Sequence, residues 1–589
     1  MDTTSTEYNI KDIKAPKVSG PLIHALAYVV AKSPLSPFIL RKLLDDNDIH
    51  LIRELAASPK CKSLAPTYFP AHKANVTDEV RTKAKEHRQF LQTGIDLQTP
   101  TSSKGKYHSI MDYHRLYKAN KALPSQVMEE LIIGAKKLEH LKMFSSFLPE
   151  DIRQQAKESD ERWKNGNAIS IFDGVPVAIK DQIPVKGHRF CRGSMIEKCV
   201  HAEEDDMLVK KLRDAGAIIV GVTVMTEGGV TPLGYNVHFD GPFNPYDTDY
   251  YSGGSSSGSA VAVASGLVPM AIGFDGGGSV RIPAAMSGTM GLAVTNGRFA
   301  FDSTSTVTKA GPLATTLEDV ALTHLLLGEN VPTSVYGKLL GEDNFPPPHL
   351  GNLVDSTGAV IAKSDLPLSG IRLGVQWDHF KHTDEEVYEA CLKSVKHLES
   401  LGAEIVDISI ENLKEIHLSH AMTILSEFGV IWEKEFNDPS HVLEPNTEIT
   451  LALGRALRAS ETMSAAKVRS YGIQQLRTNI FEGLKIDAIV SPALGSKVPK
   501  PPSNYRGHGE SDNAKVYKIM RYVPMANFLG LPGLVVPVDY EKDSGMPISF
   551  QLMGDAWSEH KLVEIGVHFE KRLERKLPQN YHEVLHKFD

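Results

Sequence analysis

The chain has 589 residues, of which 41% are hydrophobic and 23% charged, a composition that excludes wholesale disorder. Its 64 lysines and arginines against 72 aspartates and glutamates give a net charge of −8. Because phosphate binding needs clustered positive charge, this balance argues against a dedicated nucleic-acid-binding protein, and we expect no nucleic-acid partner.

The first residues, Met1 to Glu7, are polar and acidic, whereas a signal peptide begins with basic residues and an apolar run. We therefore expect a cytoplasmic protein that is not secreted. The four cysteines are too few for a disulfide framework and include no Cys-x-x-Cys pair, so the sequence favours reduced thiols. They are Cys61, Cys191, Cys199 and Cys391.

Residues 1–124 are predicted to form a helical N-terminal extension. Its longest apolar stretch, 21–31, is about half of the roughly 20 residues that span a bilayer. The pattern favours a helix packed on the enzyme body. An interfacial helix stays open as an alternative, because residues 37–44 are apolar with a basic edge.

The main domain is predicted to span residues 125–589. Apolar residues recur at helical spacing after Ser125, which is placed as the N-cap of that helix. Strands and helices then alternate, which favours an α/β fold with one large mixed sheet flanked by helices. We expect strands at 175–179, 217–220, 269–273, 371–375, 404–408, 486–492 and 534–538, and helices at 150–166, 206–215, 259–264 and 384–401, the last closed by Gly402.

A lysine and two serines stand in segments suited to catalysis. Lys180 ends an apolar strand, Ser255 lies in the glycine turn 253–259, and Ser279 follows three glycines. A serine hydroxyl attacks a carbonyl poorly until a base takes its proton, and a neutral lysine can be that base. Burial can bring a lysine pKa from about 10.4 to about 7. Asp181 would oppose this on contact, but strand alternation places it on the opposite face.

The glycines before Ser279 suit an oxyanion hole. Backbone N–H groups of Gly276, Gly277 and Gly278 can approach a substrate closely because no side chain obstructs them. Ser255 can relay protons between Lys180 and Ser279, which matters for amides because the amine must be protonated to leave.

These segments resemble the amidase signature family, and within it the plant-type fatty acid amide hydrolases. The variants 255–259 and 275–279, the surroundings of 165–167 and the opening 14–16 carry the likeness to that subgroup. By the family pattern, Ser279 is the acyl-forming nucleophile, Ser255 the bridging serine after a cis Gly254–Ser255 peptide, and Lys180 the base. The oxyanion hole falls on the N–H groups of Gly276, Gly277, Gly278 and Ser279, and Ser256 and Met225 are placed beside the substrate.

The resemblance implies a lipid-like, long-chain N-acyl amide substrate such as an N-acylethanolamine. The sequence contains no cluster of Cys and His with metal-ligand spacing, so we expect no metal and no cofactor. A homodimer and peripheral contact of the N-terminal helices with a membrane are expectations from the resemblance alone. The chain departs from the family pattern at Val222, Val224 and Ala293, which concerns the shape and polarity of the substrate wall beside Met225.

Other interpretations stay open. Within the family, the chain could act on other small or aryl amides, or belong to a glutamine-dependent amidotransferase. Residues 254–258 formally fit the G-x-S-x-G elbow, which would make Ser256 the nucleophile, but a polar loop precedes them where the elbow needs a strand. A nucleotide-binding protein is disfavoured because Walker and dinucleotide motifs are absent from the sequence.

Overall fold

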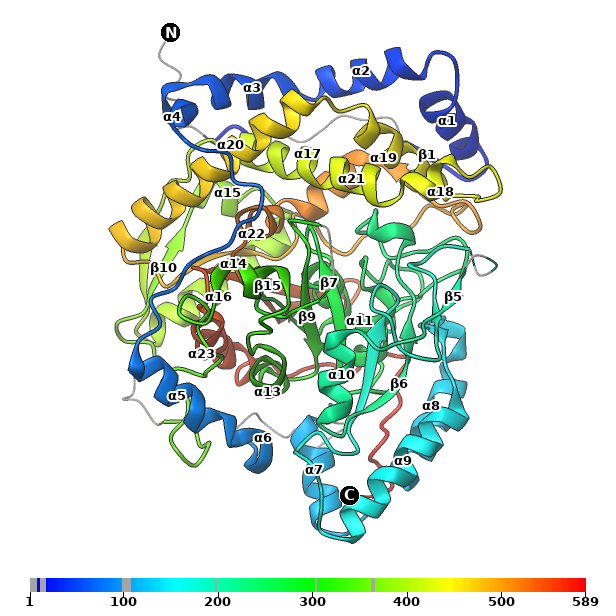
Figure 1. Cartoon of the computed structure of the whole chain (residues 1–589), viewed down its shortest axis with the longest axis vertical. Helices are drawn as coiled ribbons and strands as arrows, with labels where there is room; N and C mark the ends of the chain where they lie inside the picture. The colour runs from blue at the N-terminus through cyan, green and yellow to red at the C-terminus, as the bar shows by residue number, and fades with distance from the viewer. Residues whose placement is uncertain are drawn as a thin grey trace.

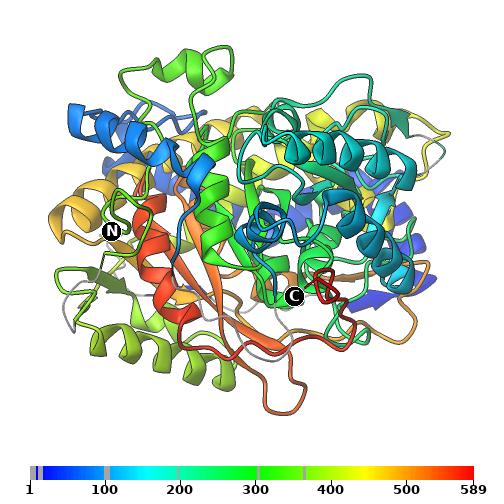
Figure 2. The same ribbon diagram turned by 90° about the horizontal axis from the view of Figure 1, so that it is seen from below.

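The centre of the protein is one mixed sheet of eleven strands, with helices over both of its faces (Figures 1 and 2). The computed structural model describes residues 8–10, 17–97, 107–195, 197, 199–301, 305–361 and 366–588. In spatial order the strands are β11 (Glu404–Asp407), β10 (Arg372–Val375), β12 (Ala488–Pro492), β15 (Pro547–Gly554), β14 (Gly533–Tyr540), β8 (Met290–Ala293), β9 (Lys309–Ala314), β7 (Met270–Asp275), β3 (Pro176–Lys180), β6 (Ile218–Thr223) and β2 (Phe144–Ser146). The predicted α/β fold with a large mixed sheet is confirmed.

Two groups of strands in this sheet run parallel. They are β11, β10 and β12 at one side and β7, β3 and β6 at the other, and antiparallel pairs join them. Every residue of β3, β6 and β7 is buried, as expected for strands covered on both faces. Because parallel strands end at the same edge, Lys180 and Asp275 reach one edge of the sheet, where α/β proteins place their ligands.

The helices confirm most of the predicted elements. The helix predicted at 259–264 starts slightly earlier, is buried along its whole length, and packs on β7, β3 and β6 through small side chains. Gly402 follows the helix predicted at 384–401, with φ +99°. From residue 110 to the C-terminus the α-helices are α7 (Ile110–Lys118), α8 (Pro124–Lys137), α9 (Pro149–Lys164), α10 (Met207–Asp214), α11 (Ser257–Ala264), α12 (Arg281–Ser287), α13 (Leu317–Leu327), α14 (Val335–Leu340), α15 (Trp377–Phe380), α16 (Glu385–Ser400), α17 (Leu413–Ile431), α18 (Glu433–Asn437), α19 (Pro445–Arg455), α20 (Ala459–Gln475), α21 (Asn513–Met520), α22 (Pro524–Leu529) and α23 (Glu559–Glu570). Two short 3₁₀ helices, η1 (Glu139–Leu141) and η3 (Glu227–Gly229), and a π-helix that continues α20, η4 (Leu476–Gly483), complete the described set.

The N-terminal extension wraps the enzyme body. Its first helices lie on α17, α19 and α20 at one end of the molecule, and an extended segment then carries the chain to α5 and α6 at the other end (Figure 1). The division at residues 124 and 125 stays a prediction, and the segments 14–16 and 1–7 lie outside the described residues. The elements before residue 110 are β1 (Lys17–Ser19, paired with β13, Glu510–Asp512), α1 (Leu22–Ala31), α2 (Ser36–Asp46), α3 (Ile49–Ala57), α4 (Pro59–Lys62), α5 (Asp78–Arg88) and α6 (Phe90–Thr93).

The predicted N-cap at Ser125 is wrong. Helix α8 begins one residue earlier, at Pro124, whose fixed φ suits the first helical position. Leu123 precedes it and donates its N–H to the Gln126 side chain at 2.9 Å. The Ser125 hydroxyl instead donates to Asp160 of α9 at 2.7 Å, so it joins two helices.

The expectation of reduced thiols is wrong for one cysteine pair. Cys191 and Cys199 form a disulfide, with their Cα atoms 4.4 Å apart. The hairpin of β4 (Arg189–Phe190) and β5 (Val200–His201) pairs residue 190 with residue 200, so the next two residues inward face each other across the hairpin. Cysteine spacing along the sequence does not reveal this pairing. Cys61 and Cys391 are buried free thiols.

Candidate active site

Lys180 is a fully buried lysine whose amine faces a serine. Strand β3 carries it between β6 and β7, and its Nζ donates to Ser255 Oγ at 2.7 Å and to the Phe274 carbonyl at 3.2 Å. Burial lowers the pKa of this amine to about 7, although the charges of Asp275 and Asp181 act in the opposite direction. A neutral lysine at this position can accept a proton from Ser255.

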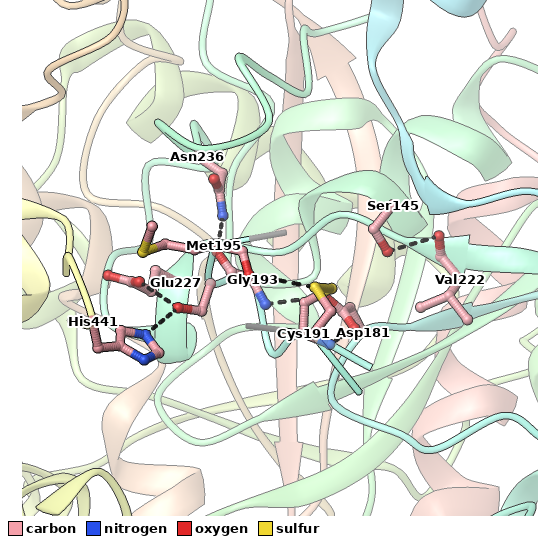
Figure 3. The surroundings of a disulfide bond; sticks show 11 residues. Ser145, Asp181, Cys191, Gly193, Met195, Val222, Glu227, Asn236 and His441 are labelled. Atoms are coloured by element: carbon pink, nitrogen blue, oxygen red, sulfur yellow. Dashed lines mark hydrogen bonds between the residues drawn. A yellow bond between two sulfur atoms is a disulfide. The ribbon is translucent and has the colours of Figure 1, made fainter. Parts of the chain in front are cut away.

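Asp181 points away from the lysine amine, as strand alternation predicts. Its carboxylate accepts the N–H groups of Cys191 at 2.8 Å and Gly193 at 3.0 Å (Figure 3). Burial raises its pKa to about 7, and these amide bonds oppose the rise. No ion pair joins Asp181 to Lys180 in the part of the chain that the structure describes. Instead, Asp181 fixes the loop that carries the disulfide.

Ser255 and Ser256 enter the site from the turn before α11. The Gly254–Ser255 peptide bond is cis, as the resemblance implies, and Ser255 is buried against Lys180. The Ser256 hydroxyl donates to the Phe274 carbonyl at 3.2 Å, and its N–H donates to the Ser279 carbonyl at 3.1 Å. Ser256 thus holds the two serine loops together. Its hydroxyl is bonded to a backbone carbonyl, and the Lys180 amine contacts Ser255 instead, which argues against Ser256 as an elbow nucleophile.

Ser279 lies in the loop between β7 and α12 and is half-buried. Gly278 before it has φ +107°, and a Cβ at that position would lie 2.6 Å from Val523. Only glycine fits there. The Gly278 N–H donates to Asp275 Oδ1 at 2.6 Å, which leaves the N–H groups of Gly276, Gly277 and Ser279 for an oxyanion. Among the described residues no hydrogen bond joins the Ser255 and Ser279 hydroxyls, so that link would have to close with substrate.

A buried ionic network supports this loop, and the sequence interpretation gave its members no role. Arg281 donates to both Asp275 oxygens at 3.0 Å, and to Asn527 and Gln551. Asp275 also accepts the backbone N–H groups of residues 278, 280 and 281. The Arg281 guanidinium and the buried amides hold the pKa of Asp275 far below its usual range, although desolvation alone would raise it. The one available signal was that Asp275 and Arg281 flank the glycine run.

A cavity of about 460 Å³ opens beside the site. Its walls are mostly apolar and come from the strand ends, the disulfide loop and α17. The lining residues are Gln182, Phe190, Arg192, Met225, Gly228, Phe274, Ser305, Thr308, Val335, Phe428, Ile431 and Trp432. Met225, which the resemblance places beside the substrate, lines this cavity. Val222, Val224 and Ala293 are buried and do not line this cavity, so those departures from the family pattern leave its wall untouched.

Within the described residues, no group of three or more His, Cys, Asp or Glu side chains is arranged to hold a metal ion. The arrangement offers a buried base, two hydroxyls and free backbone donors at the mouth of an apolar cavity. This combination suits acyl transfer.

Comparison with known proteins places this geometry in a family. A sequence model of the family described as Amidase matches residues 127–563. The chain is 30% identical to a fatty acid amide hydrolase from Medicago truncatula over 99% of this chain and 98% of that protein. It is also 30% identical to a glutamyl-tRNA(Gln) amidotransferase subunit from Prochlorococcus marinus, over 73% of this chain and 90% of that protein.

Solved structures agree with the sequence comparison. A crystal structure described as an amidase superimposes with a TM-score of 0.64 at 25% identity, covering 79% of this chain and all of that one. The part of the chain left over, about a fifth, has no counterpart in that structure. The plant relative, in contrast, matches almost from end to end.

Proposed function

Because the chain belongs to the amidase signature family, we propose that it hydrolyses long-chain N-acyl amides, such as N-acylethanolamines, to a fatty acid and an amine. The family model and the fatty acid amide hydrolase relatives show an amidohydrolase that acts on amides. The finer assignment of substrate is supported by the apolar cavity, which is lined by Phe274 next to Lys180, and by the full-length match to the plant relative.

The observation that carries the mechanism is the 2.7 Å contact between Lys180 Nζ and Ser255 Oγ. The amine is buried and, among the described residues, forms no ion pair with a carboxylate. In the first half-reaction, neutral Lys180 takes the Ser255 proton while Ser255 takes that of Ser279. Ser279 Oγ then attacks the amide carbonyl carbon, and the oxyanion that forms accepts the loop N–H groups. Ser255 returns a proton to the amide nitrogen, and the C–N bond breaks.

The second half-reaction restores the enzyme. Water replaces the departed amine, and the same base path takes one of its protons as it attacks the acyl-Ser279 carbonyl. The ester bond to Ser279 breaks, the hydroxyl regains its proton, and the fatty acid leaves. No proton is gained or lost by the protein over the cycle.

Labelling with a fluorophosphonate probe followed by mass spectrometry tests the nucleophile. We expect the probe on Ser279, and a loss of amidase activity of about 10⁴-fold or more in Ser279→Ala. Ser256→Ala is the matched control, because its neighbouring hydroxyl donates only to a backbone carbonyl. A probe on Ser256, with activity retained in Ser279→Ala, would overturn the proposal.

A second candidate function follows from the amidotransferase relative. A chain of that kind would hydrolyse glutamine, a small polar amide, whereas the lining of the cavity is mostly apolar. A panel of oleamide, N-oleoylethanolamine, short-chain and aryl amides and free glutamine separates the two. Preference for the long-chain members supports the proposed function, and preference for glutamine contradicts it.

We also propose peripheral membrane contact through α1 and α2 of a cytoplasmic enzyme. These helices bury one face, but Leu22 of α1 is 73% exposed, Phe38 of α2 is 71% exposed, and Leu35 in the turn between them is 65% exposed. The prediction of helices packed on the enzyme body therefore holds for only part of their apolar surface. In the described residues no single helix is long and apolar enough to cross a bilayer, and only the pair α1 and α2, bent by 97°, passes that test together. Cosedimentation with liposomes should weaken in Phe38→Ser, and unchanged binding would refute the contact.

A homodimer remains a proposal from the resemblance. Light scattering coupled to gel filtration of the full chain measures its mass directly, and a monomer at micromolar concentration would contradict it.

A further inference from the structure

Arg192 is the one charged residue among the described residues that line the cavity. Its backbone is fixed on all sides. The N–H groups of both neighbours, Cys191 and Gly193, donate to Asp181 (Figure 3). The carbonyl of Arg192 itself accepts the Gly228 N–H at 3.0 Å. Its φ is +55°, and the disulfide closes the loop behind it. A side chain on so constrained a backbone is presented to the cavity in a defined way.

The guanidinium of Arg192 has N–H donors that are not used in a hydrogen bond among the described residues. Its centre lies 4.4 Å from the centroid of the Trp432 ring, a cation–π contact. Nη2 pairs with Glu435. Within the part of the chain that the structure describes, Nε and Nη1 meet no acceptor. An arginine fixed in this way can bind a second carboxylate beside the first.

The position of Arg192 relates it to the amine part of a substrate. Ser255 is the group that protonates the leaving amine in the proposed mechanism, so the amine part lies on the Ser255 side of the scissile carbonyl. Gly228, which bonds to the Arg192 carbonyl, precedes Gly229, and a Cβ on Gly229 would lie 3.2 Å from Ser255 Oγ. The backbone of Arg192 thus lies on the Ser255 side of the site, and its side chain extends from there into the cavity wall.

We propose that Arg192 is a specificity-determining residue that binds a carboxylate carried by the amine part of the substrate, which makes long-chain N-acyl amino acids a substrate class of this enzyme. The inference rests on the proposed function and deepens it. The carboxylate pairs with the free edge of the guanidinium, Trp432 keeps the guanidinium plane in place, and the acyl chain occupies the apolar part of the cavity. Glu435 opposes the binding, because its negative charge lies beside the incoming one.

Steady-state kinetics with three oleoyl amides test this proposal on the purified full-length chain. The amides are N-oleoylglycine, N-oleoylethanolamine and oleamide, which share an acyl chain and differ in the amine part. We expect Arg192→Gln to lower kcat/KM for N-oleoylglycine about tenfold or more, mostly through KM, as loss of a charge-assisted hydrogen bond does. The value for oleamide should change less than about threefold, since it carries no carboxylate.

Two further variants separate recognition from structural damage. Arg189→Gln removes an exposed arginine on the same hairpin that does not line the cavity, and it should leave all three amides unchanged. Glu435→Gln removes the opposing carboxylate but keeps Arg192, so N-oleoylglycine should become a better substrate relative to oleamide.

The outcomes that overturn the proposal are distinct from failure of the proposed function. Hydrolysis of oleamide without hydrolysis of N-oleoylglycine contradicts the role proposed for Arg192 but is consistent with the proposed function. An equal fall in kcat/KM for all three amides in Arg192→Gln shows that Arg192 has only a structural role, which also contradicts the proposal. Absence of hydrolysis of every member of the panel contradicts the proposed function itself.

Discussion

Two buried lysines lie on the two strands that flank β7, yet only one faces a hydroxyl. Lys180 ends β3 and Lys309 begins β9, and their side chains are 0% and 1% exposed. Burial lowers the pKa of each amine to about 7. The Lys180 amine meets Ser255, whereas the Lys309 amine donates to the carbonyls of Ala526 at 3.1 Å and Leu531 at 2.6 Å.

The two lysines are equally buried and differ in the groups that their amines contact. A carbonyl oxygen has no proton to give, so Lys309 can only donate, and it fixes the chain around α22. A hydroxyl can give up its proton, so Lys180 can serve as a base. A lowered pKa is therefore found for both lysines, and only the groups that contact each amine distinguish a catalytic lysine from a structural one.

The largest expected effect separates the two lysines by activity. Lys180→Met removes the proposed base and should lower kcat/KM about 10²- to 10⁴-fold. Lys309→Met should lose far less, within about tenfold, because it removes no reacting group. Initial rates with oleamide measure both. Similar losses of kcat/KM in the two variants would show that Lys180 and Lys309 do not differ in their roles.

The pH dependence of the reaction tests whether Lys180 acts as the base. Only the neutral form of Lys180 accepts a proton, so kcat/KM should rise about tenfold per pH unit below its pKa of about 7 and level off above it. The sign follows from burial, which disfavours the charged form and brings deprotonation toward neutrality. A pH–rate profile from 5 to 10 tests this, and an optimum below neutrality would contradict the lysine base.

The disulfide supports only one of the two lysines. It closes the loop whose amides hold Asp181, next to Lys180, whereas the bonds described for Lys309 go to the carbonyls of Ala526 and Leu531. Replacing both Cys191 and Cys199 with serine should lower the free energy of unfolding by about 2 to 3 kcal/mol, the value for a short closed loop. Urea denaturation of the double variant and of the dithiothreitol-reduced enzyme measures it. An unchanged midpoint in both would show that the loop needs no crosslink.

The smallest expected effect falls on stability at the structural lysine. Lys309→Met leaves the carbonyls of Ala526 and Leu531 buried without their donor, which should cost about 1 to 3 kcal/mol. Urea midpoints of this variant and Lys180→Met are compared at the same pH. If Lys309→Met proves the more stable of the two, the structural role assigned to Lys309 is wrong.

Much of the fold is predictable from the sequence because its signals are local. Apolar runs such as 534–538 and the small-residue helix after Ser256 report their own burial, and they lie in β14 and α11 as expected. The Ser125 cap was mistaken because the serine faces Asp160, thirty-five residues away, and no local pattern shows that. The Cys191–Cys199 pair was missed because only the hairpin register brings the two residues together.

The sequence by itself determined the family, the run of strands and helices, and the placement of Lys180, Ser255 and Ser279 in segments able to support catalysis, because glycine turns and apolar strands are written in neighbouring residues. The tertiary structure decided which buried lysine meets a hydroxyl, that Asp275 and Arg281 brace the nucleophile loop, and that Arg192 faces the cavity. Those outcomes depend on contacts between residues far apart in the chain, and such contacts exist only once the sheet has brought the strand ends together.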